Sequence, residues 1–391
     1  MMETHTPTLD AETRDLFAAS VARYGEHKYT FDHYKKLLRA APGFGVQAWK
    51  DYADMGWLAA ASPLDDGGLD SDPAAIAALM RYAGEHLALE PLFANVVLCA
   101  RLLALCGDAP GAQERLQALA SGGRLFALAH AENLIDGMNG AVAAHFSDGR
   151  LTGCKRVVLH GDVADELLVT AQAGGGQTRE HSVLCAVDPK QAGVRKTVFR
   201  LVDGRGSASF EFDDALATVL PAPGSAAVLV ERTLEDARLA LCAEAHGAMR
   251  ALNRQTLAYL KERRQFGRPI GTNQALQHRM VELFMLEQEV AAVVAAAQRA
   301  AAQAGAWRRR AILGAVAYTM SAGRQIAHEA VQMHGGIGTT DELAVSHYFK
   351  RIMVCNRLLG DRDAHMDAFA RATVYTVAGD IPDEEPDHRE P

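Results

Sequence analysis

The sequence predicts an α+β protein that is mostly helical, with an N-terminal helical domain, a middle β-barrel and a C-terminal antiparallel helical bundle. Alanine and leucine recur at helical spacing in the first third, and short β-branched runs between turn residues fill the middle. Long patterns of apolar residues three and four positions apart fill the last third. The expected boundaries are 1–123 for the helical domain, 124–226 for the barrel, 227–378 for the bundle and 379–391 for a disordered acidic tail.

The N-terminal region divides into helical segments separated by turn residues. Proline and glycine cluster at 41–43 and, with aspartate, at 63–68, where they favour turns over helix. The segments Pro73–Leu87 and Ala94–Leu105 carry apolar side chains at helical spacing. We therefore expect a helix in each of these two segments.

The middle region has the pattern of short paired strands. Asp148-Gly149 lies between two of them and is a strong hairpin signal, because a two-residue turn needs the positive φ that glycine adopts freely. Regular short strands without intervening helices are typical of a barrel or sandwich rather than of a parallel sheet. The expected strands are Leu125–His130, Ala141–Phe146, Leu151–Leu159, Glu166–Ala171, Ser182–Val187, Val194–Leu201 and Ser209–Phe212.

Long helices return in the last third. They are expected at Arg238–Arg263, Gln274–Ala302 and Arg308–Met333, where apolar residues keep helical spacing. Helices of this length joined by short loops are typical of an antiparallel bundle. The final residues are acidic and rich in proline, which predicts a disordered tail.

The composition excludes several classes of protein. With 391 residues, 49% of them hydrophobic, the chain is expected to form a folded protein of more than one unit. The net charge of −8 argues against a general nucleic-acid binder. Six cysteines without a CxxC pair argue against a disulfide framework or a thiolate zinc site and suit a reducing compartment. Because no apolar run is long enough to span a membrane, a cytoplasmic enzyme is expected.

Two motifs in the last third resemble the flavin signatures of the acyl-CoA dehydrogenase family. Glu262–Ile270, followed by Gln274, is similar to the family's ERxxFGxxI…Q motif, and Gln332–Gly338 is similar to its QxxGGxG motif. Pro63–Leu69 resembles the early PEExGGxG turn, and Phe210–Asp214 resembles the strand that leaves the family's barrel. The resemblance covers nearly the whole chain. It implies FAD as cofactor and an acyl-CoA as substrate.

The chemistry of these motifs agrees with a flavin site. Arg263 can offer several donors to a pyrophosphate, and paired glycines allow backbone N–H groups to approach phosphate oxygens. The alternative explanation is that Arg263 is a solvated charge at a helix end and that the glycine pair only caps a helix. In the family the two motifs hold the adenine-diphosphate half of an FAD that lies partly on a neighbouring subunit, so the resemblance also implies an oligomer. The residues that it assigns to the cofactor are Arg263, Phe266, Gln274, Gln332, Gly335 and Gly336.

The middle region carries a weaker match to the segments that contact the flavin ring in the family. Residues 129–133 stand where a TEPxAGSD-like segment is usual, and residues 155–161 stand where a WIT-like strand is usual, with Val157 in place of the tryptophan. His130 and His160 lie in these segments. Each is explained either by an internal hydrogen bond or by contact with flavin or thioester.

The catalytic base that the resemblance implies is missing. Family members remove the substrate α-proton with a glutamate, whose pKa partial desolvation raises toward the operating pH. Alignment of His347–Lys350 with the family's YYRD-like segment places Leu359 at the usual glutamate position. A subset of the family uses a glutamate at the start of the helix before ERxxFG, where this chain has Ala237 and Arg238. Neither of the two usual base positions therefore holds a glutamate.

Nearby acidic residues remain as candidates. Asp361 lies two residues beyond Leu359, on the loop that the family places at the thioester, and it is the candidate base, with N-capping of the following segment as its other explanation. Glu244 lies about two turns along the same helix face as the alternative position. Glu235 and Asp236 flank that position, where we expect them to act as charges at a helix N-terminus.

Three segments resemble one subgroup of the family, the small subunit of pimeloyl-CoA dehydrogenase and its relatives: residues 158–169, 242–279 and 347–365. Such subunits pair with a related subunit in some bacterial systems. The resemblance implies either an oxidoreductase that makes a 2,3-enoyl-CoA and passes electrons to an electron-transfer flavoprotein, or a non-catalytic subunit whose partner supplies the base. A flavin-free CoA-binding scaffold is a third possibility. The expected assembly is a homo-oligomer, dimer or tetramer, or a heteromer with a related subunit.

Overall fold

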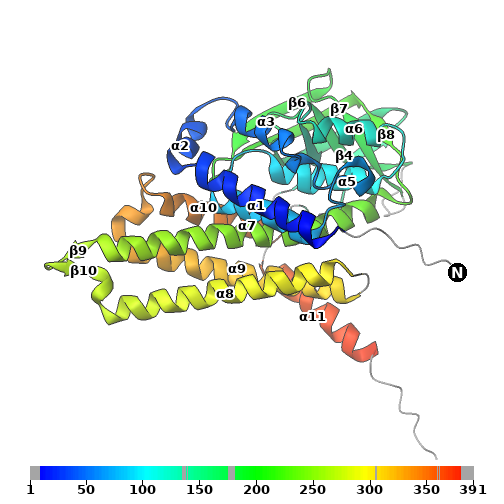
Figure 1. Cartoon of the computed structure of the whole chain (residues 1–391). Coiled ribbons are helices and arrows are strands. Elements are labelled where there is room, and N and C mark those ends of the chain that lie inside the picture. Colours follow the sequence, from blue (N-terminus) through cyan, green and yellow to red (C-terminus); the bar gives the residue numbers. More distant parts are fainter. Residues whose placement is uncertain are drawn as a thin grey trace, which may run out of the picture.

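The computed structural model describes residues 9–133, 138, 140–174, 181–303, 306–358, 360 and 362–379. The N-terminal helices and a sheet lie along one side of a long helical bundle (Figure 1). The order of helices, sheet and helices confirms the predicted fold class, while the exact boundaries of the three regions stay predictions. The predicted tail lies outside the described residues from position 380 onwards.

The N-terminal region is helical, and its helices begin at capping residues. The Asp10 carboxylate accepts the Thr13 N–H at the start of α1, and Asp72 accepts two backbone N–H groups at the start of α4. Pro73 is the first residue of α4, a position that requires no N–H donor. The helices are α1 (Ala11–Lys28), α2 (Phe31–Arg39), α3 (Val46–Asp54), α4 (Pro73–Glu85), α5 (Arg101–Leu105) and α6 (Ala112–Ala120), with short 3₁₀ turns η1 (Trp57–Ala59) and η2 (Leu64–Asp66).

Both helices that the sequence predicted in this region are present, the second in two parts. The helix from Pro73 ends at Glu85. The segment predicted as Ala94–Leu105 begins as η3 (Phe93–Ala100), which has π-helical hydrogen bonding, and continues as α5. π-Helical turns are rare and frequently accompany functional sites, so η3 indicates a candidate functional region.

The middle region forms one mixed sheet. The predicted hairpin is confirmed: Ser147 pairs with Arg150, and both Asp148 and Gly149 between them have positive φ. β4 runs parallel to β1 and β2 and antiparallel to β5. The strands are β1 (Phe126–Ala129), β2 (His145–Ser147), β3 (Arg150–Leu159), β4 (Glu166–Ala173), β5 (Ser182–Val187), β6 (Val194–Arg200), β7 (Gly206–Leu216) and β8 (Thr218–Leu220).

The predicted β-barrel corresponds to a central sheet, and no closed barrel is found among the described residues. The strand order is β6-β7-β3-β2-β4-β5-β8 with β1 beside β4, and among the described residues no pairing joins β6 to β8. The edge strand β6 exposes Arg195 and Lys196, and charged side chains at an edge oppose further strand pairing. The prediction rested on the number and spacing of strands, which are the same in an open sheet and in a barrel.

The last third forms the predicted bundle. The helices expected from Gln274 and Arg308 are confirmed, but the first helix begins at Ala226 instead of Arg238, with Ser225 as its N-cap. Thr233 lies inside this helix, and its hydroxyl donates to the Leu229 carbonyl of the same helix. Among the described residues each helix is too short or too polar to cross a membrane. The elements are α7 (Ala226–Glu262), β9 (Arg264–Gln265), β10 (Arg268–Pro269), η6 (Ile270–Thr272), α8 (Gln274–Ala301), α9 (Ala306–His334), η7 (Gly335–Thr339), α10 (Ala344–Leu358) and α11 (Arg362–Gly379).

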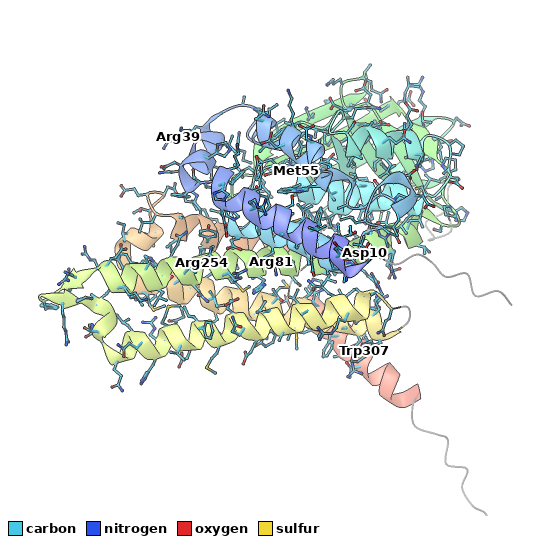
Figure 2. All side chains as sticks on the ribbon, in the orientation of Figure 1. Asp10, Arg39, Met55, Arg81, Arg254 and Trp307 are labelled. Carbon is cyan, nitrogen blue, oxygen red and sulfur yellow. The ribbon has the colours of Figure 1, made fainter. Side chains whose placement is uncertain are left out.

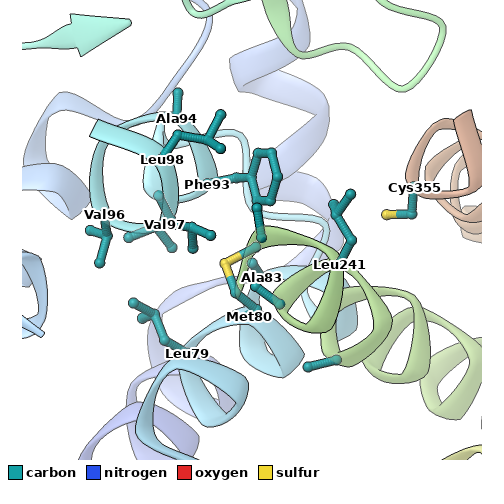
Figure 3. Close-up of a cluster of buried hydrophobic side chains, with 14 of the residues drawn as sticks. Leu79, Met80, Ala83, Phe93, Ala94, Val96, Val97, Leu98, Leu241 and Cys355 are labelled. Carbon is teal, nitrogen blue, oxygen red and sulfur yellow. The ribbon is translucent and has the colours of Figure 1, made fainter. Parts of the chain in front are cut away.

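Helices α4 and α7 cross with their backbones in contact. A Cβ atom at Gly84 would lie 1.8 Å from the Glu244 carbonyl oxygen, and a Cβ atom at Gly247 would lie 2.0 Å from the Arg81 carbonyl oxygen. Only glycine therefore fits at the two positions. The apolar core around this crossing is continuous from the N-terminal helices into the bundle, and its members in Figure 3 include Met80, Phe93 and Leu241.

Candidate functional site

A cavity of about 410 Å³ lies where the N-terminal helices, the sheet and α10 meet. Every residue that lines it is apolar except Asn133 and Arg357. A largely apolar cavity with a few polar groups is the usual form of a site for a cofactor or small molecule. The lining residues are Phe93 and Leu98 of η3, Leu128 of β1, Ala131, Asn133 and Met138 after β1, Val157 and Leu159 of β3, Leu201 and Val202 after β6, and Met353, Val354, Arg357 and Leu358 of α10.

The sheet side of the cavity comes from the two segments that the sequence matched to flavin contacts. Asn133 belongs to the segment 129–133, and Val157 belongs to the segment 155–161, where the predicted alignment places it at the family's tryptophan. Val157 has φ +50°, a left-handed conformation that is an outlier for a β-branched residue. Backbone outliers of this kind cluster at functional sites.

No carboxylate lines the cavity within the part of the chain that the structure describes. Leu358 lines it at the end of α10. The candidate base Asp361 and its neighbour Leu359 both lie outside the described residues. The described wall can therefore hold an apolar ligand, but it offers no proton acceptor of the carboxylate kind.

Glu244, another candidate base, lies in a buried cluster of four charges. Its carboxylate is 0% exposed and lies 3.1 Å from Arg205 Nη1 and 3.0 Å from Arg351 Nη1. Asp203 completes the cluster, with its Oδ2 2.7 Å from Arg205 Nε and 2.9 Å from Arg351 Nε. Burial alone would raise the pKa of Asp203, but the two guanidinium groups hold it below its ordinary value. Because Glu244 is enclosed by these partners, it has no access to a substrate.

The acidic pair on α7 also has a structural role, and its predicted position is wrong. Because α7 begins at Ala226, Glu235 and Asp236 lie well inside the helix and not at its N-terminus. Arg308 pairs with both carboxylates, at 2.6 Å from Glu235, and Arg101 lies 2.9 Å from Asp236. These contacts join α7 to α9 and α5.

The two histidines of the sheet segments are hydrogen-bonded inside the protein and do not line the cavity. His130 Nδ1 lies 2.9 Å from Thr170 Oγ1, and His160 Nε2 lies 3.1 Å from the Leu89 carbonyl oxygen. Burial lowers the pKa of each to about 4, and for His130 the nearby Lys155 cation adds to this effect. The structure therefore favours internal hydrogen bonding for both.

The two motifs of the last third meet at the end of the bundle that is remote from the sheet, around the β9–β10 hairpin (Figure 1). One turn before Arg263, the Tyr259 hydroxyl donates to the His334 carbonyl at 3.3 Å, and the two rings stack with centroids 4.3 Å apart. Because Gly335 follows His334 directly, this contact brings the motifs together. All six residues assigned to the cofactor are exposed: Arg263, Phe266, Gln274, Gln332, Gly335 and Gly336.

The chemistry of this end of the bundle fits an anionic group such as the pyrophosphate of FAD. Arg263 forms no ion pair with any described residue, so its donors are available to a ligand. A Cβ atom at Gly335 or Gly336 would meet nothing within 4 Å, which leaves the backbone there open to approach. Phe266 is fully exposed at the tip of the hairpin, at 102%, as expected of a side chain that contacts a partner.

Residues 227–374 match the family model described as acyl-CoA dehydrogenase, C-terminal domain. The acyl-CoA dehydrogenase IpdE2 of Mycolicibacterium smegmatis is 26% identical over 351 residues, which cover 90% of this chain and 95% of that protein. The family model and this relative support the acyl-CoA dehydrogenase family for the chain. Members of that family are generally FAD-dependent oxidoreductases.

Other similar proteins also match nearly the whole chain. FadE27 of Mycobacterium tuberculosis is 28% identical over 362 residues, 89% of this chain and 94% of that protein. The ChsE4-ChsE5 complex of Mycobacterium tuberculosis contains a chain with a TM-score of 0.81 and 24% identity, which covers 94% of this chain and 98% of that one. At this identity the structural match establishes the shared fold.

Sequence reasoning missed most of the cavity wall. Phe93, Met353 and Arg357 carry no motif, and helical periodicity marks residues as buried without showing which of them border an empty space. One feature of the sequence could have indicated Arg357, because it is a cation beside two leucines at the end of a helix. Its place at the cavity follows only from the packing of α10 against α7 and α9.

Proposed function

We propose that this protein oxidises an acyl-CoA thioester to the 2,3-enoyl-CoA with FAD, and that electrons then pass to an electron-transfer flavoprotein. The observation that carries the proposal is the apolar cavity, because its wall includes residues of both segments that resemble the family's flavin-contacting segments. When bound there, FAD supplies the acceptor for the hydride that leaves the substrate β-carbon.

The chain's own residues would bind and orient the reactants. Phe93, Leu98 and Met353 would surround the acyl chain and exclude water, a contribution that grows with the apolar area buried. Asn133 and Arg357 would place hydrogen-bond donors at the wall. Asp361 is the candidate within this chain for removal of the α-proton.

Arg263→Ala is expected to lower the affinity for FAD at least about tenfold. The loss of one charge-assisted hydrogen bond to a phosphate costs about 1.5–3 kcal/mol, which corresponds to a factor of about ten or more in affinity. Titration of the apoprotein with FAD measures the change, and helical circular dichroism reports whether the fold persists.

The neighbouring Arg264→Ala is the matched control. Arg264 is exposed on the same hairpin and carries the same charge, but it occupies a variable position of the family motif. We expect the affinity of this variant for FAD to change less than about threefold, because exposed charges contribute little binding energy. Equal losses of FAD affinity in both variants would show that only the general positive charge of the hairpin contributes to FAD binding.

We also expect the protein to form an oligomer. The cavity and the Arg263 surface lie in different parts of one chain, so a single FAD that reaches both would be shared between subunits (Figure 1). The outer face of α8 exposes Val281, Phe284 and Met285 at 56%, 57% and 54%, an apolar stripe suited to a protein interface. The outward projection of the α8 side chains is visible in Figure 2.

Light scattering of the FAD-loaded protein is therefore expected to give a dimer or tetramer, either of this chain alone or with a related subunit. Phe284→Glu should shift this assembly toward the monomer, because it places a charge at the centre of the stripe. A flavin-loaded monomer at micromolar concentration would contradict the shared site.

A second candidate function is favoured by the absence of a carboxylate from the described cavity wall. In this alternative the chain shapes the FAD and acyl-CoA sites of a heteromer, and a related partner chain supplies the base, as in the pimeloyl-CoA dehydrogenase small-subunit type. The structural relative in the ChsE4-ChsE5 complex supports a heteromeric assembly, since that complex combines two chains.

The reaction itself can be tested with FAD-loaded protein and a panel of acyl-CoA thioesters, mixed without oxygen. We expect loss of the oxidised-flavin absorbance and formation of a 2,3-enoyl-CoA, identified by mass spectrometry. The same panel is applied after co-expression with a related subunit. If neither preparation bleaches with any thioester, the proposed reaction is wrong.

A further inference from the structure

Lys155 is a buried cation that the proposed chemistry does not use. Its side chain is 0% exposed, and its Nζ lies 2.7 Å from Glu132 Oε1. The ammonium also donates to the His130 carbonyl at 3.1 Å and to Thr170 Oγ1 at 3.2 Å. A buried ammonium with this set of partners is fixed in place, because any displacement would leave a charge unpaired away from water.

Glu132 ties together the two ends of the connection from β1 to β2. Its Oε2 accepts the Ala143 N–H at 2.8 Å, and its Oε1 accepts the Ala144 N–H at 2.9 Å. Ala144 packs against β3 where a Cβ atom at Gly153 would lie only 2.8 Å from its Cα. The same connection contributes Asn133 to the cavity wall.

β3 changes register directly after Lys155. Lys155 pairs with Phe210 of β7 and Val158 pairs with Ala208, so two residues of β3 lie opposite one residue of β7. This is a β-bulge, which redirects the side chains that follow it. Val158 consequently points into the core of the sheet, while Val157 lines the cavity.

The conformation of Val157 needs support from its neighbours. Its φ of +50° is unfavourable for a β-branched residue and persists only where the surroundings impose it. Within the bulge, the Arg156 N–H donates to the Ala131 carbonyl at 2.7 Å. Directly before the bulge, Lys155 is held by its ion pair with Glu132.

We propose that Lys155 and Glu132 form a positioning clasp, which holds Val157 in its left-handed conformation and keeps Asn133 beside it, so that the two residues form one wall of the cavity. Neither member of the clasp touches the cavity itself. The inference rests on the proposed flavin site for its functional meaning. Its structural part concerns backbone amides and is measurable without any cofactor.

The test uses the double variant Lys155→Met/Glu132→Leu in the full chain. Removing one charge alone could prevent folding, whereas exchange of a buried ion pair for apolar residues of similar size is often tolerated. Hydrogen exchange at Ala143 and Ala144 is expected to accelerate at least about tenfold, because both amides lose their acceptor. The dissociation constant for FAD is expected to rise at least about tenfold.

Val157→Gly in the double-variant background separates positioning from general stability. Glycine adopts positive φ without strain, so it should keep the bulge when the clasp is gone and recover most of the FAD affinity. It should not slow the exchange of Ala143 and Ala144, because their acceptor remains absent.

The control is Arg115→Met/Glu166→Leu, which removes a partly buried ion pair of 2.7 Å between α6 and β4, together with the contact of Glu166 to Arg124. The clasp is wrong if this control produces the same changes, or if the Lys155→Met/Glu132→Leu variant keeps the wild-type exchange rates and FAD affinity. A wild-type protein that binds no FAD would instead count against the proposed function. In that case the exchange rates would still decide whether the clasp holds the connection.

Discussion

Arg351→Met is expected to lower the free energy of unfolding by about 3–5 kcal/mol, the usual cost of removing one partner from a buried ion pair. Arg351 is 0% exposed on α10 and contacts both carboxylates of the four-charge cluster. It also donates to the Ala88 carbonyl at 3.0 Å. Without it, Asp203 and Glu244 would share the single cation of Arg205. A loss of this size is a large part of the 5–15 kcal/mol that stabilises a typical domain.

Lys350→Met is the matched control for this measurement. Lys350 is the preceding residue of α10 and pairs with Asp341 at 2.6 Å, but that carboxylate is 73% exposed. We expect a loss of at most about 1 kcal/mol, as for other exposed ion pairs. Chemical denaturation of both variants gives the two values. Similar losses would mean that the cluster contributes no more than a surface pair.

The isolated, FAD-loaded chain is expected to bleach its flavin with acyl-CoA at least about 100-fold more slowly than a complex with a related, base-bearing subunit. A general base typically accelerates a proton transfer by about 10²–10⁴-fold. The predicted alignment places Leu359 at the family's glutamate position and Ala237 at the alternative one, and the described cavity wall has no carboxylate. Stopped-flow absorbance of the flavin, recorded with and without the partner, measures the ratio.

Asp361→Asn distinguishes a base within the chain from one in the partner. If Asp361 is the base, this variant abolishes bleaching while FAD and CoA binding remain intact. If a partner supplies the base, the same change in the complex reduces turnover only modestly. Rapid bleaching by the isolated wild-type chain that survives Asp361→Asn would refute both assignments and show that the alignment around Leu359 is displaced.

The sequence predicted the features that depend on local patterns. The hairpin at Asp148-Gly149 and the helix from Gln274 follow from turn chemistry and periodicity over a few neighbouring residues. The family motifs around Arg263 and Gly335 were also visible, because they consist of adjacent residues. The roles of these residues stay predictions, although the structure brings the two motifs to one end of the bundle.

The features that the sequence did not reveal depend on contacts between distant segments. Glu244 was a candidate base in the sequence, because helical spacing does not show that Arg205 and Arg351 enclose its carboxylate. Closure of the sheet depends on the pairing of β6 and β8, which strand spacing does not specify. The cavity combines η3, β3 and α10, and no local pattern records their relative positions.

The glycine contact between α4 and α7 has a consequence for synthesis of the chain. Gly84 leaves the ribosome before the entire sheet, whereas Gly247, which packs against the same helix, follows it. The face of α4 that packs against α7 therefore stays uncovered while the sheet is translated. Exposed apolar surfaces of this kind in nascent chains are prone to misassociation. We expect chaperone binding during translation to be concentrated in this interval, and ribosome-bound intermediates that end before α7 to be protease-sensitive in α4.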